Sequence, residues 1–178
     1  MQRQISVCQT GKLELVRLRM EENFIKRKLH IQKVKNCIEN LDGIELICIL
    51  KEDENQKLST IKQEYFPYIN SYSYAKKPDS KMNYNATEKQ LYQWIKAQTN
   101  LNSHKKYYFY CSGVWMQIYI RDIDLGIKSL WYHNKYLGYP QSYGFVFVDE
   151  EIENMIEIGS DSRDEYHYLY DMYSLINL

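Results

Sequence analysis

The sequence predicts an α+β fold, a single compact domain in which helices pack against a largely antiparallel sheet. The chain has 178 residues, 44% of them hydrophobic, which is enough for one domain (residues 1–178) with its own core. Segments with apolar residues at helical spacing alternate with short runs rich in Val, Ile, Tyr and Phe, which are typical of strands. Short turns join several of these runs, and this favours antiparallel pairing.

The N-terminal part of the chain predicts a hairpin followed by a helix. Residues 5–7 and 13–15 alternate apolar and polar side chains around Thr10 and Gly11, which indicates a short hairpin. Asn23 can cap a helix that continues to Leu41. The apolar residues of this helix recur at helical spacing and predict a buried stripe of Phe24, Ile31, Val34, Ile38 and Leu41.

A strand and a long connection are expected next. Asp42 and Gly43 end the helix, and the apolar run at residues 44–50 predicts a mostly buried strand. Residues 51–86 hold few aliphatic side chains and predict a long irregular connection, with a short helix near residues 58–64. Because loops of this length often have a function, the connection is a candidate binding loop or subdomain link.

Residues 87–120 predict a capped helix and a hairpin. Thr87 and Gln90 have the spacing of a capping box for a helix that ends near Thr99 and buries Leu91, Trp94 and Ile95. Residues 107–111 and 114–120 are expected to form two strands joined by a turn at Ser112 and Gly113.

The remaining sequence predicts one further helix and three strands. Asp122 or Asp124 caps a helix that stops at Gly138 and turns inward Ile123, Ile127, Leu130, Trp131 and Leu137. Strands follow at residues 145–148, 155–158 and 165–172. In the last strand Tyr166, Tyr168 and Tyr170 share one face, and Glu165, His167, Leu169 and Asp171 share the other.

The four cysteines, Cys8, Cys37, Cys48 and Cys111, lack the spacing of a metal or redox motif. The last three lie in apolar runs, so we expect small buried side chains in a reducing compartment. The sequence also shows neither a secretory signal nor an apolar run of membrane-spanning length. Together these features predict a cytoplasmic protein.

Charge is balanced in the whole chain but not along it. The 23 basic and 23 acidic residues argue against a dedicated nucleic-acid binder. Residues 149–171 contain one base, Arg163, and nine acids, Asp149, Glu150, Glu151, Glu153, Glu157, Asp161, Asp164, Glu165 and Asp171. This segment can present an acidic surface to a basic partner, or it can be a solvated acidic loop near a basic helix of the same chain.

Tyrosine is unusually frequent, with 18 residues. An AT-rich genome explains the average excess, but local clusters can anchor a partner because tyrosine offers a stiff, amphipathic contact surface. The expected partner-binding residues combine the acidic and the tyrosine-rich features: Asp161, Asp164, Glu165, Tyr166, His167, Tyr168, Glu150 and Glu151.

None of the histidines (His30, His104, His133 and His167) has the spacing of a helical metal motif, and each is expected to be a satisfied surface or boundary residue. His167 is the best catalytic candidate, because acidic residues lie beside it and a carboxylate could orient its imidazole. The sequence offers no nucleophile next to it. We therefore predict no catalytic residue, no metal and no cofactor, and a protein that is not an enzyme.

Two basic segments support an alternative function in binding or processing nucleic acid. Basic residues cluster in the segment 26–35 and again at His104, Lys105 and Lys106, just before the aromatic residues 107–110. Stacking aromatics beside lysines suit single-stranded nucleic acid. In a strand, however, at least half of these aromatic side chains should pack in the core. The turn amides of residues 159–164 could hold an anion, although the acids of that turn oppose it. A third possible function is that of a viral or mobile-element accessory domain with only an assembly role.

The C-terminal third resembles a known family. A hairpin strand, an Asp-capped helix and a further strand are followed by Met155-Ile-Glu-Ile-Gly-Ser-Asp161, a short turn and Tyr166-His-Tyr-Leu-Tyr-Asp171. This arrangement, over about residues 114–172, resembles the SUKH superfamily, an α+β fold common among bacterial toxin-immunity proteins. The resemblance implies a non-enzymatic binder without a cofactor, which neutralises a cognate toxin by occluding its active or substrate-binding surface.

Overall fold

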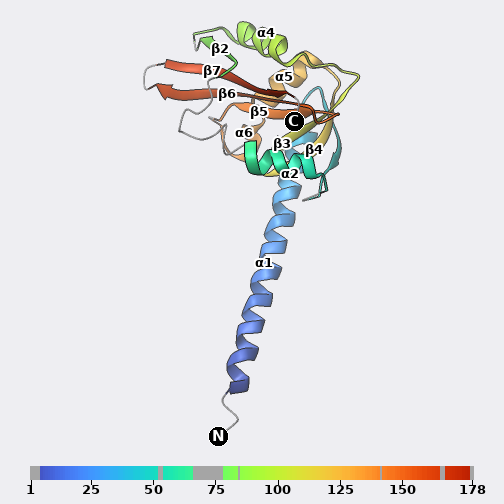
Figure 1. The fold of residues 1–178 in the computed structure, drawn as a ribbon, viewed down its shortest axis with the longest axis vertical. Coiled ribbons are helices and arrows are strands. Elements are labelled where there is room, and N and C mark those ends of the chain that lie inside the picture. The colour runs from blue at the N-terminus through green and yellow to red at the C-terminus, as the bar shows by residue number, and fades with distance from the viewer. Residues whose placement is uncertain are drawn as a thin grey trace.

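The computed structural model describes residues 5–51, 54–65, 78–83, 85–140, 142–164 and 167–176. Within these residues seven strands form one sheet in the order β1-β4-β3-β5-β6-β7-β2, and all its neighbouring strands are antiparallel (Figure 1). Helices pack on the sheet, so the α+β prediction is confirmed. The elements are α1 (Ile5–Glu39), β1 (Ile44–Ile49), α2 (Gln56–Thr60) with the π-helical turn η1 (Ile61–Tyr65), β2 (Ser80–Asn83), α4 (Glu88–Thr99), β3 (Lys106–Cys111), β4 (Val114–Ile120), α5 (Ile123–Trp131), α6 (Asn134–Leu137), β5 (Gly144–Asp149), β6 (Asn154–Asp164) and β7 (His167–Ile176).

The predicted N-terminal hairpin is wrong, because α1 continues without interruption from Ile5 to Glu39 and projects from the body as a rod (Figure 1). Its 35 residues correspond to a length of about 52 Å at 1.5 Å per residue. The expected turn at Gly11 is helical because one glycine inside a helix costs only about 1 kcal/mol. Asn23 therefore lies within the helix and does not cap it.

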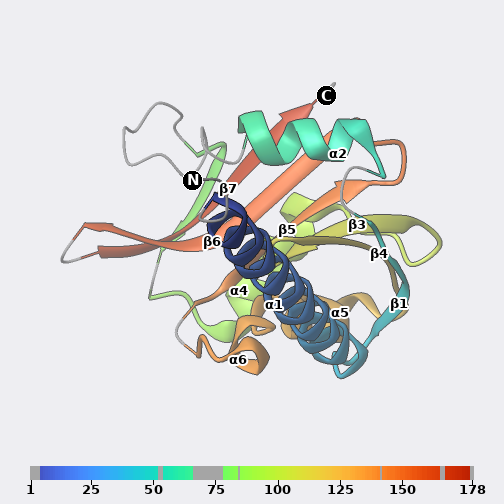
Figure 2. The same ribbon diagram turned by 90° about the horizontal axis from the view of Figure 1, so that it is seen from below.

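One face of the sheet is covered by the C-terminal part of α1 together with α4, α5 and α6 (Figure 2). Val34 and Ile38 of α1 are fully buried there, packed in the same cluster as Phe109 of β3 and Trp131 of α5. The prediction of a buried stripe is therefore confirmed for Val34, Ile38 and Leu41. It is wrong for Phe24, because α1 has already left the body at that point and the side chain is exposed.

The opposite face of the sheet is covered by α2 and η1 (Figure 2). Leu58 and Ile61 are buried against Trp115, Val148 and Met155. The segment predicted to be a long irregular connection thus contains this helix, as expected near residues 58–64, and also strand β2, which was not expected. Residues 66–77 lie outside the described part of the chain.

The connection between β1 and β2 is long because these strands form the two opposite edges of the sheet. The chain has to travel across six interstrand spacings of about 4.8 Å, roughly 29 Å, before β2 can pair with β7. As an edge strand β1 is only partly buried, and the prediction of a mostly buried strand is wrong.

Three local predictions in the middle of the chain are confirmed: a capping box, a tight turn and a helix cap. Thr87 and Gln90 form both hydrogen bonds of the capping box that opens α4. Ser112 and Gly113 have φ values of 48° and 87°, as a tight turn between β3 and β4 requires. Asp122, and not Asp124, caps α5 by accepting a hydrogen bond from the amide of Leu125.

The predicted helix to Leu137 is divided into α5 and α6 at Tyr132 and His133. It ends as expected at Gly138, which adopts a left-handed conformation with a φ of 96°. The turn expected at residues 159–164 is wrong, because β6 continues to Asp164 and Gly159 pairs with Asp171 of β7. Figure 2 shows the β6–β7 hairpin extending beyond the other strands. The amides of residues 159–164 thus belong to a strand and do not form an anion-binding turn.

Candidate functional site

The described members of the expected partner-binding set lie in two separate places. Glu150 and Glu151 lie in the turn between β5 and β6, whereas Asp161 and Asp164 lie toward the far end of β6. His167 and Tyr168 begin β7 beside that far end, where Asp164 pairs with His167; Glu165 and Tyr166 fall outside the described residues. About 23 Å of extended strand separates the start of β6 at Asn154 from Asp161, at roughly 3.3 Å per residue.

Lysines of the same molecule accompany the acids of the β5–β6 turn. Glu150 lies 3.6 Å from the ammonium of Lys106, and Glu151 lies 3.6 Å from that of Lys105. Such exposed pairs contribute about 0–1 kcal/mol each, so they shape the local potential more than they stabilise the fold. Of the two interpretations of the acidic segment, a solvated acidic loop near basic residues of the same chain therefore applies to this turn. The basic residues come from the start of strand β3 and not from a helix.

The aromatic strand that supported the nucleic-acid alternative is built into the core. Tyr107 and Phe109 are buried on one face of β3, and Tyr108 and Tyr110 pack against the α2 side of the sheet. This confirms that at least half of the aromatic run packs in the core. Its rings therefore do not offer an open stacking platform.

The basic part of α1 is also engaged within the molecule. Lys26 and Lys35 form ion pairs with Glu22 and Glu39, one helical turn away in each case. Lys33 donates a hydrogen bond of 2.6 Å to the carbonyl oxygen of Leu137. Arg27 and His30, two further basic residues of α1, line a cavity described below.

The exposed apolar surface of α1 is the most unusual feature of the described chain. Met20, Phe24, Ile25 and Leu29 have exposed fractions of 67%, 58%, 57% and 66%. At 100° per residue, Met20 and Phe24 lie on the side of the helix that buries Val34 and Ile38 further along, while Ile25 and Leu29 lie on the opposite side. This part of α1 is therefore apolar on two faces, and neither face is covered by the body.

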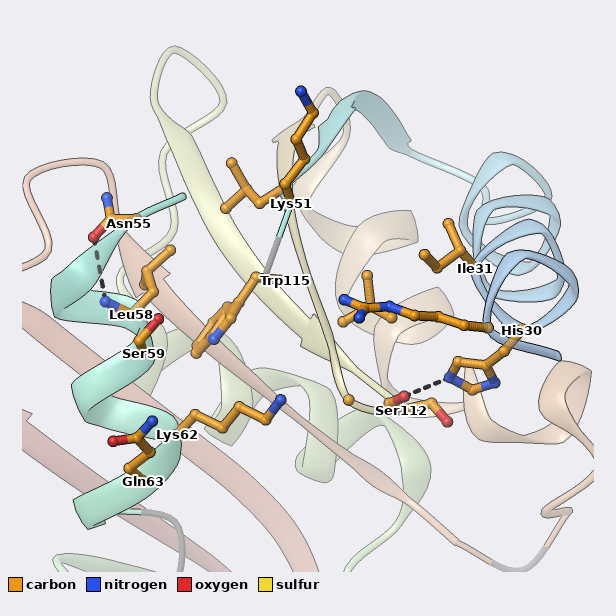
Figure 3. A pocket seen from close by; sticks show the side chains of 14 residues that line it. His30, Ile31, Lys51, Asn55, Leu58, Ser59, Lys62, Gln63, Ser112 and Trp115 are labelled. Atoms are coloured by element: carbon orange, nitrogen blue, oxygen red, sulfur yellow. Dashed lines mark hydrogen bonds between the residues drawn. The ribbon is translucent and has the colours of Figure 1, made fainter. Parts of the chain in front are cut away.

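A cavity of about 520 Å³ lies where α1 passes the end of the sheet (Figure 3). Its walls come from α1, from the β1–α2 connection with α2 and η1, and from the β3–β4 turn with the start of β4. His30 of α1 donates a hydrogen bond of 2.7 Å from Nε2 to the carbonyl oxygen of Ser112, which ties the helix to the turn. The other basic residues on its wall are Arg27, Lys51 and Lys62.

His30 and His133 make hydrogen bonds to backbone carbonyls within the fold. His133 is buried, contrary to the expected surface or boundary position, and its Nδ1 donates a hydrogen bond of 2.7 Å to the carbonyl oxygen of Leu130. Burial lowers the pKa of this imidazole. His30 is satisfied at the surface as predicted, and the side chain of His167 lies outside the described part of the structure.

Two of the cysteines behave as expected and one does not. Cys37 and Cys111 are buried free thiols, and the hydrogen bond to Cys37, together with burial, raises the pKa of Cys111 well above its usual range. Cys48 is exposed, because β1 is an edge strand with an irregular register between Leu46 and Cys48. Within the described residues no group of three His, Cys, Asp or Glu side chains could hold a metal ion.

Neither the exposed face of α1 nor the cavity was expected from the sequence. The apolar residues at positions 20, 25 and 29 were a possible signal for the first, since they fall outside the stripe that continues into the core. The cavity has no local signal, because residues far apart in the sequence form its walls.

Comparisons with protein-family models, curated proteins and solved structures give no match to this chain. Across the part of the chain that the structure describes, we find no helix with the length and apolarity needed to span a membrane. The arguments about function therefore rest on the geometry of the chain itself.

Proposed function

We propose that the chain is a non-enzymatic protein-binding module of the immunity type, which neutralises a cognate toxin by occluding its active or substrate-binding surface. The observation that carries the proposal is the exposed apolar surface of α1, because several large apolar side chains exposed close together on a folded protein usually mark a site of protein contact. A helix with apolar side chains on two opposite sides can be enclosed by a partner that contacts both sides, a variant of recognition of a helix in a groove.

The four exposed side chains are large enough to anchor a complex. Complete burial of one such residue is worth about 1.5–3 kcal/mol, and Met20, Phe24, Ile25 and Leu29 are each more than half exposed in the free protein. Their burial would therefore supply about 4–8 kcal/mol before the entropic costs of association. This is a sufficient core for an interface whose remaining contacts are polar.

The β6–β7 hairpin would supply the electrostatic part of the interaction. Asp161, Asp164 and Glu165 lie in the acidic segment of the sequence, with only Arg163 as a base among them. An acidic projection accelerates association with a basic partner and contributes less to the final affinity. The proposed partner is therefore a toxin that has a basic surface as well as a groove that receives α1.

The first prediction uses the protein encoded beside this chain in its genome as the candidate toxin. Replacing Met20, Phe24, Ile25 and Leu29 together by Gln should weaken the complex at least about 30-fold, since losing one interface hot spot already costs about 2 kcal/mol. A control variant with Glu22→Gln and Lys26→Gln removes one exposed ion pair of the same helix and should keep the wild-type affinity. Calorimetry measures binding, and bacterial growth during co-expression measures protection.

The same assay separates the role of the hairpin. Asp161→Lys, Asp164→Lys and Glu165→Lys together should slow association and flatten its dependence on salt. The immunity role is wrong if the neighbouring protein neither binds nor is neutralised. The assignment of α1 is wrong if the four-fold Gln variant binds normally, and that of the hairpin is wrong if on-rates at low salt do not change.

A further inference from the structure

We infer that the cavity between α1, α2 and the β3–β4 turn binds a small phosphate ester with an apolar or aromatic part, such as a nucleoside monophosphate. Its volume of about 520 Å³ lies within the range of roughly 300–1,000 Å³ that is usual for small-molecule sites. The site shares no residue with the exposed apolar set of α1, and it goes beyond the proposed protein-binding function.

The charge of the cavity favours an anion. Arg27 and Lys62 contribute cationic side chains from two walls, whereas the ammonium of Lys51 points away from Trp115 in Figure 3. None of the described residues on the wall is a carboxylate, although the whole chain has equal numbers of acids and bases. Figure 3 shows the side chain of Lys62 extending from its helix toward α1. An arginine and a lysine on opposite walls can hold a phosphate by charge-assisted hydrogen bonds from two directions.

The lysines are available for a ligand within the described part of the chain. The ammonium groups of Lys51 and Lys62 form no ion pair or hydrogen bond with any side chain or carbonyl that the structure describes there. This contrasts with Lys26, Lys33 and Lys35, which all have partners within the molecule. Lys62, together with Arg27 on the facing wall, raises the local potential of the cavity and attracts an anion.

The walls of the cavity are fixed without a ligand. The hydrogen bond from His30 to Ser112 holds α1 against the β3–β4 turn, and the side chain of Asn55 caps α2 by accepting from the amide of Leu58 at 3.3 Å. The amide of Lys51 donates to a carboxylate oxygen of Glu54 at 2.7 Å, which anchors the backbone beside the cavity. A preformed site loses little entropy when its ligand binds.

The apolar part of the wall indicates more than inorganic phosphate. Trp115 lies between α2 and α1 in Figure 3, and Leu50, Leu58 and Val114 line the cavity near it. A bare phosphate ion would leave this surface in contact with water. A phosphate ester with a ring or an apolar chain would use both parts, since apolar walls with a few well-placed charged groups are typical of small-molecule sites.

The test uses the purified full chain and a panel of probes: inorganic phosphate, adenosine, the four common nucleoside monophosphates, phenyl phosphate, glucose 6-phosphate and hexaglutamate. Calorimetry should show at least one phosphate ester binding at least tenfold more tightly than both inorganic phosphate and adenosine. Lys62→Gln and Arg27→Gln should each weaken that ester by about 10- to 100-fold, the usual effect of losing one hydrogen bond to a charged group.

The matched control is Lys128→Gln on α5, which removes one exposed lysine away from the cavity and should leave binding unchanged. The inference is wrong if no ester binds more tightly than inorganic phosphate, if hexaglutamate binds best, or if Lys128→Gln has the same effect as Lys62→Gln. Because the toxin is absent from this experiment, its result does not depend on the proposed immunity function.

Discussion

His133 shows how one buried side chain can connect the core to pH. Its imidazole packs edge-to-face on Phe109, with ring centroids 5.1 Å apart, and donates from Nδ1 to Leu130. Because burial lowers its pKa below the ordinary value of 6.5, the folded protein resists protonation of this group while the unfolded chain accepts it. The unfolded state therefore binds more protons just below pH 6.5.

We predict that the free energy of unfolding falls as the pH drops below about 6.5, with a contribution from His133 of at most about 1.4 kcal/mol per pH unit. The contribution is fully present above that pH, where both states are neutral at this position. Urea unfolding at pH 7.5, 6.5 and 5.5 measures it. His133→Asn should remove this part of the slope, whereas His104→Asn, at an exposed turn, should not; equal slopes in all three proteins would contradict the prediction.

Among the elements, α1 combines a structural half and an exposed half in one continuous helix. Ile38 is fully buried in the core, and Ile25 is 57% exposed on the projecting part. These two isoleucines form a matched pair within one helix. They allow the cost of burial to be separated from helix propensity.

Ile38→Ala should lower the free energy of unfolding by about 2–5 kcal/mol, because it removes buried methyl groups and leaves a cavity. Ile25→Ala should change it by less than about 0.5 kcal/mol, as exposed substitutions usually do. Urea unfolding followed by circular dichroism compares the two variants with the wild type. A large loss at Ile25 would mean that this side chain is already covered in the free protein.

Elements with a local sequence signal were predictable, and those defined by distant partners were not. The Thr87 capping box, the turn at Ser112 and the cap at Asp122 depend on neighbours in the sequence, and all three are present. Periodicity predicts which face of a helix is apolar, but it does not show where the body ends, so Phe24 was expected to be buried. The sequence did not predict strand β2, because its polar residues have no strand pattern of their own and become a strand only by pairing with β7.

The same limit applies to the candidate sites. The acidic segment was visible in the sequence, but its division between the two ends of β6 follows from the strand pairing. The cavity requires Arg27, Lys62 and Ser112 to meet, and no pattern within any one segment indicates that they do.

At the scale of the whole molecule, β2 closes one edge of the sheet through few contacts. The carboxylate of Asp79 accepts hydrogen bonds from the amide and hydroxyl of Ser174 at 2.7 and 3.0 Å, and Trp94 of α4 donates to the hydroxyl of Ser80 at 3.0 Å. The strand therefore depends on side-chain contacts at its beginning as well as on its ladder with β7.

Asp79→Ala should loosen this edge without unfolding the rest of the sheet. Hydrogen exchange of the amides in β2 should become about tenfold faster or more, since losing a hydrogen bond to a charged group costs about 1.5–3 kcal/mol. Exchange in β3 and β4 should not change, and mass spectrometry of peptides from the three strands compares them. Faster exchange throughout the sheet would show that the edge and the centre open together.

The strand order also governs how the chain can fold during its synthesis. Strand β1 leaves the ribosome before β4, its partner, exists, and at roughly 5–20 residues per second the delay is several seconds. Strand β2 waits even longer, because its partner β7 follows all the other strands. The nascent chain thus carries two unpaired strands, the later edges of the sheet, while the central strands are still being synthesised. The polar sequence of β2, Ser-Lys-Met-Asn, suits that interval, whereas the apolar β1 is the segment that a nascent-chain chaperone would be expected to protect.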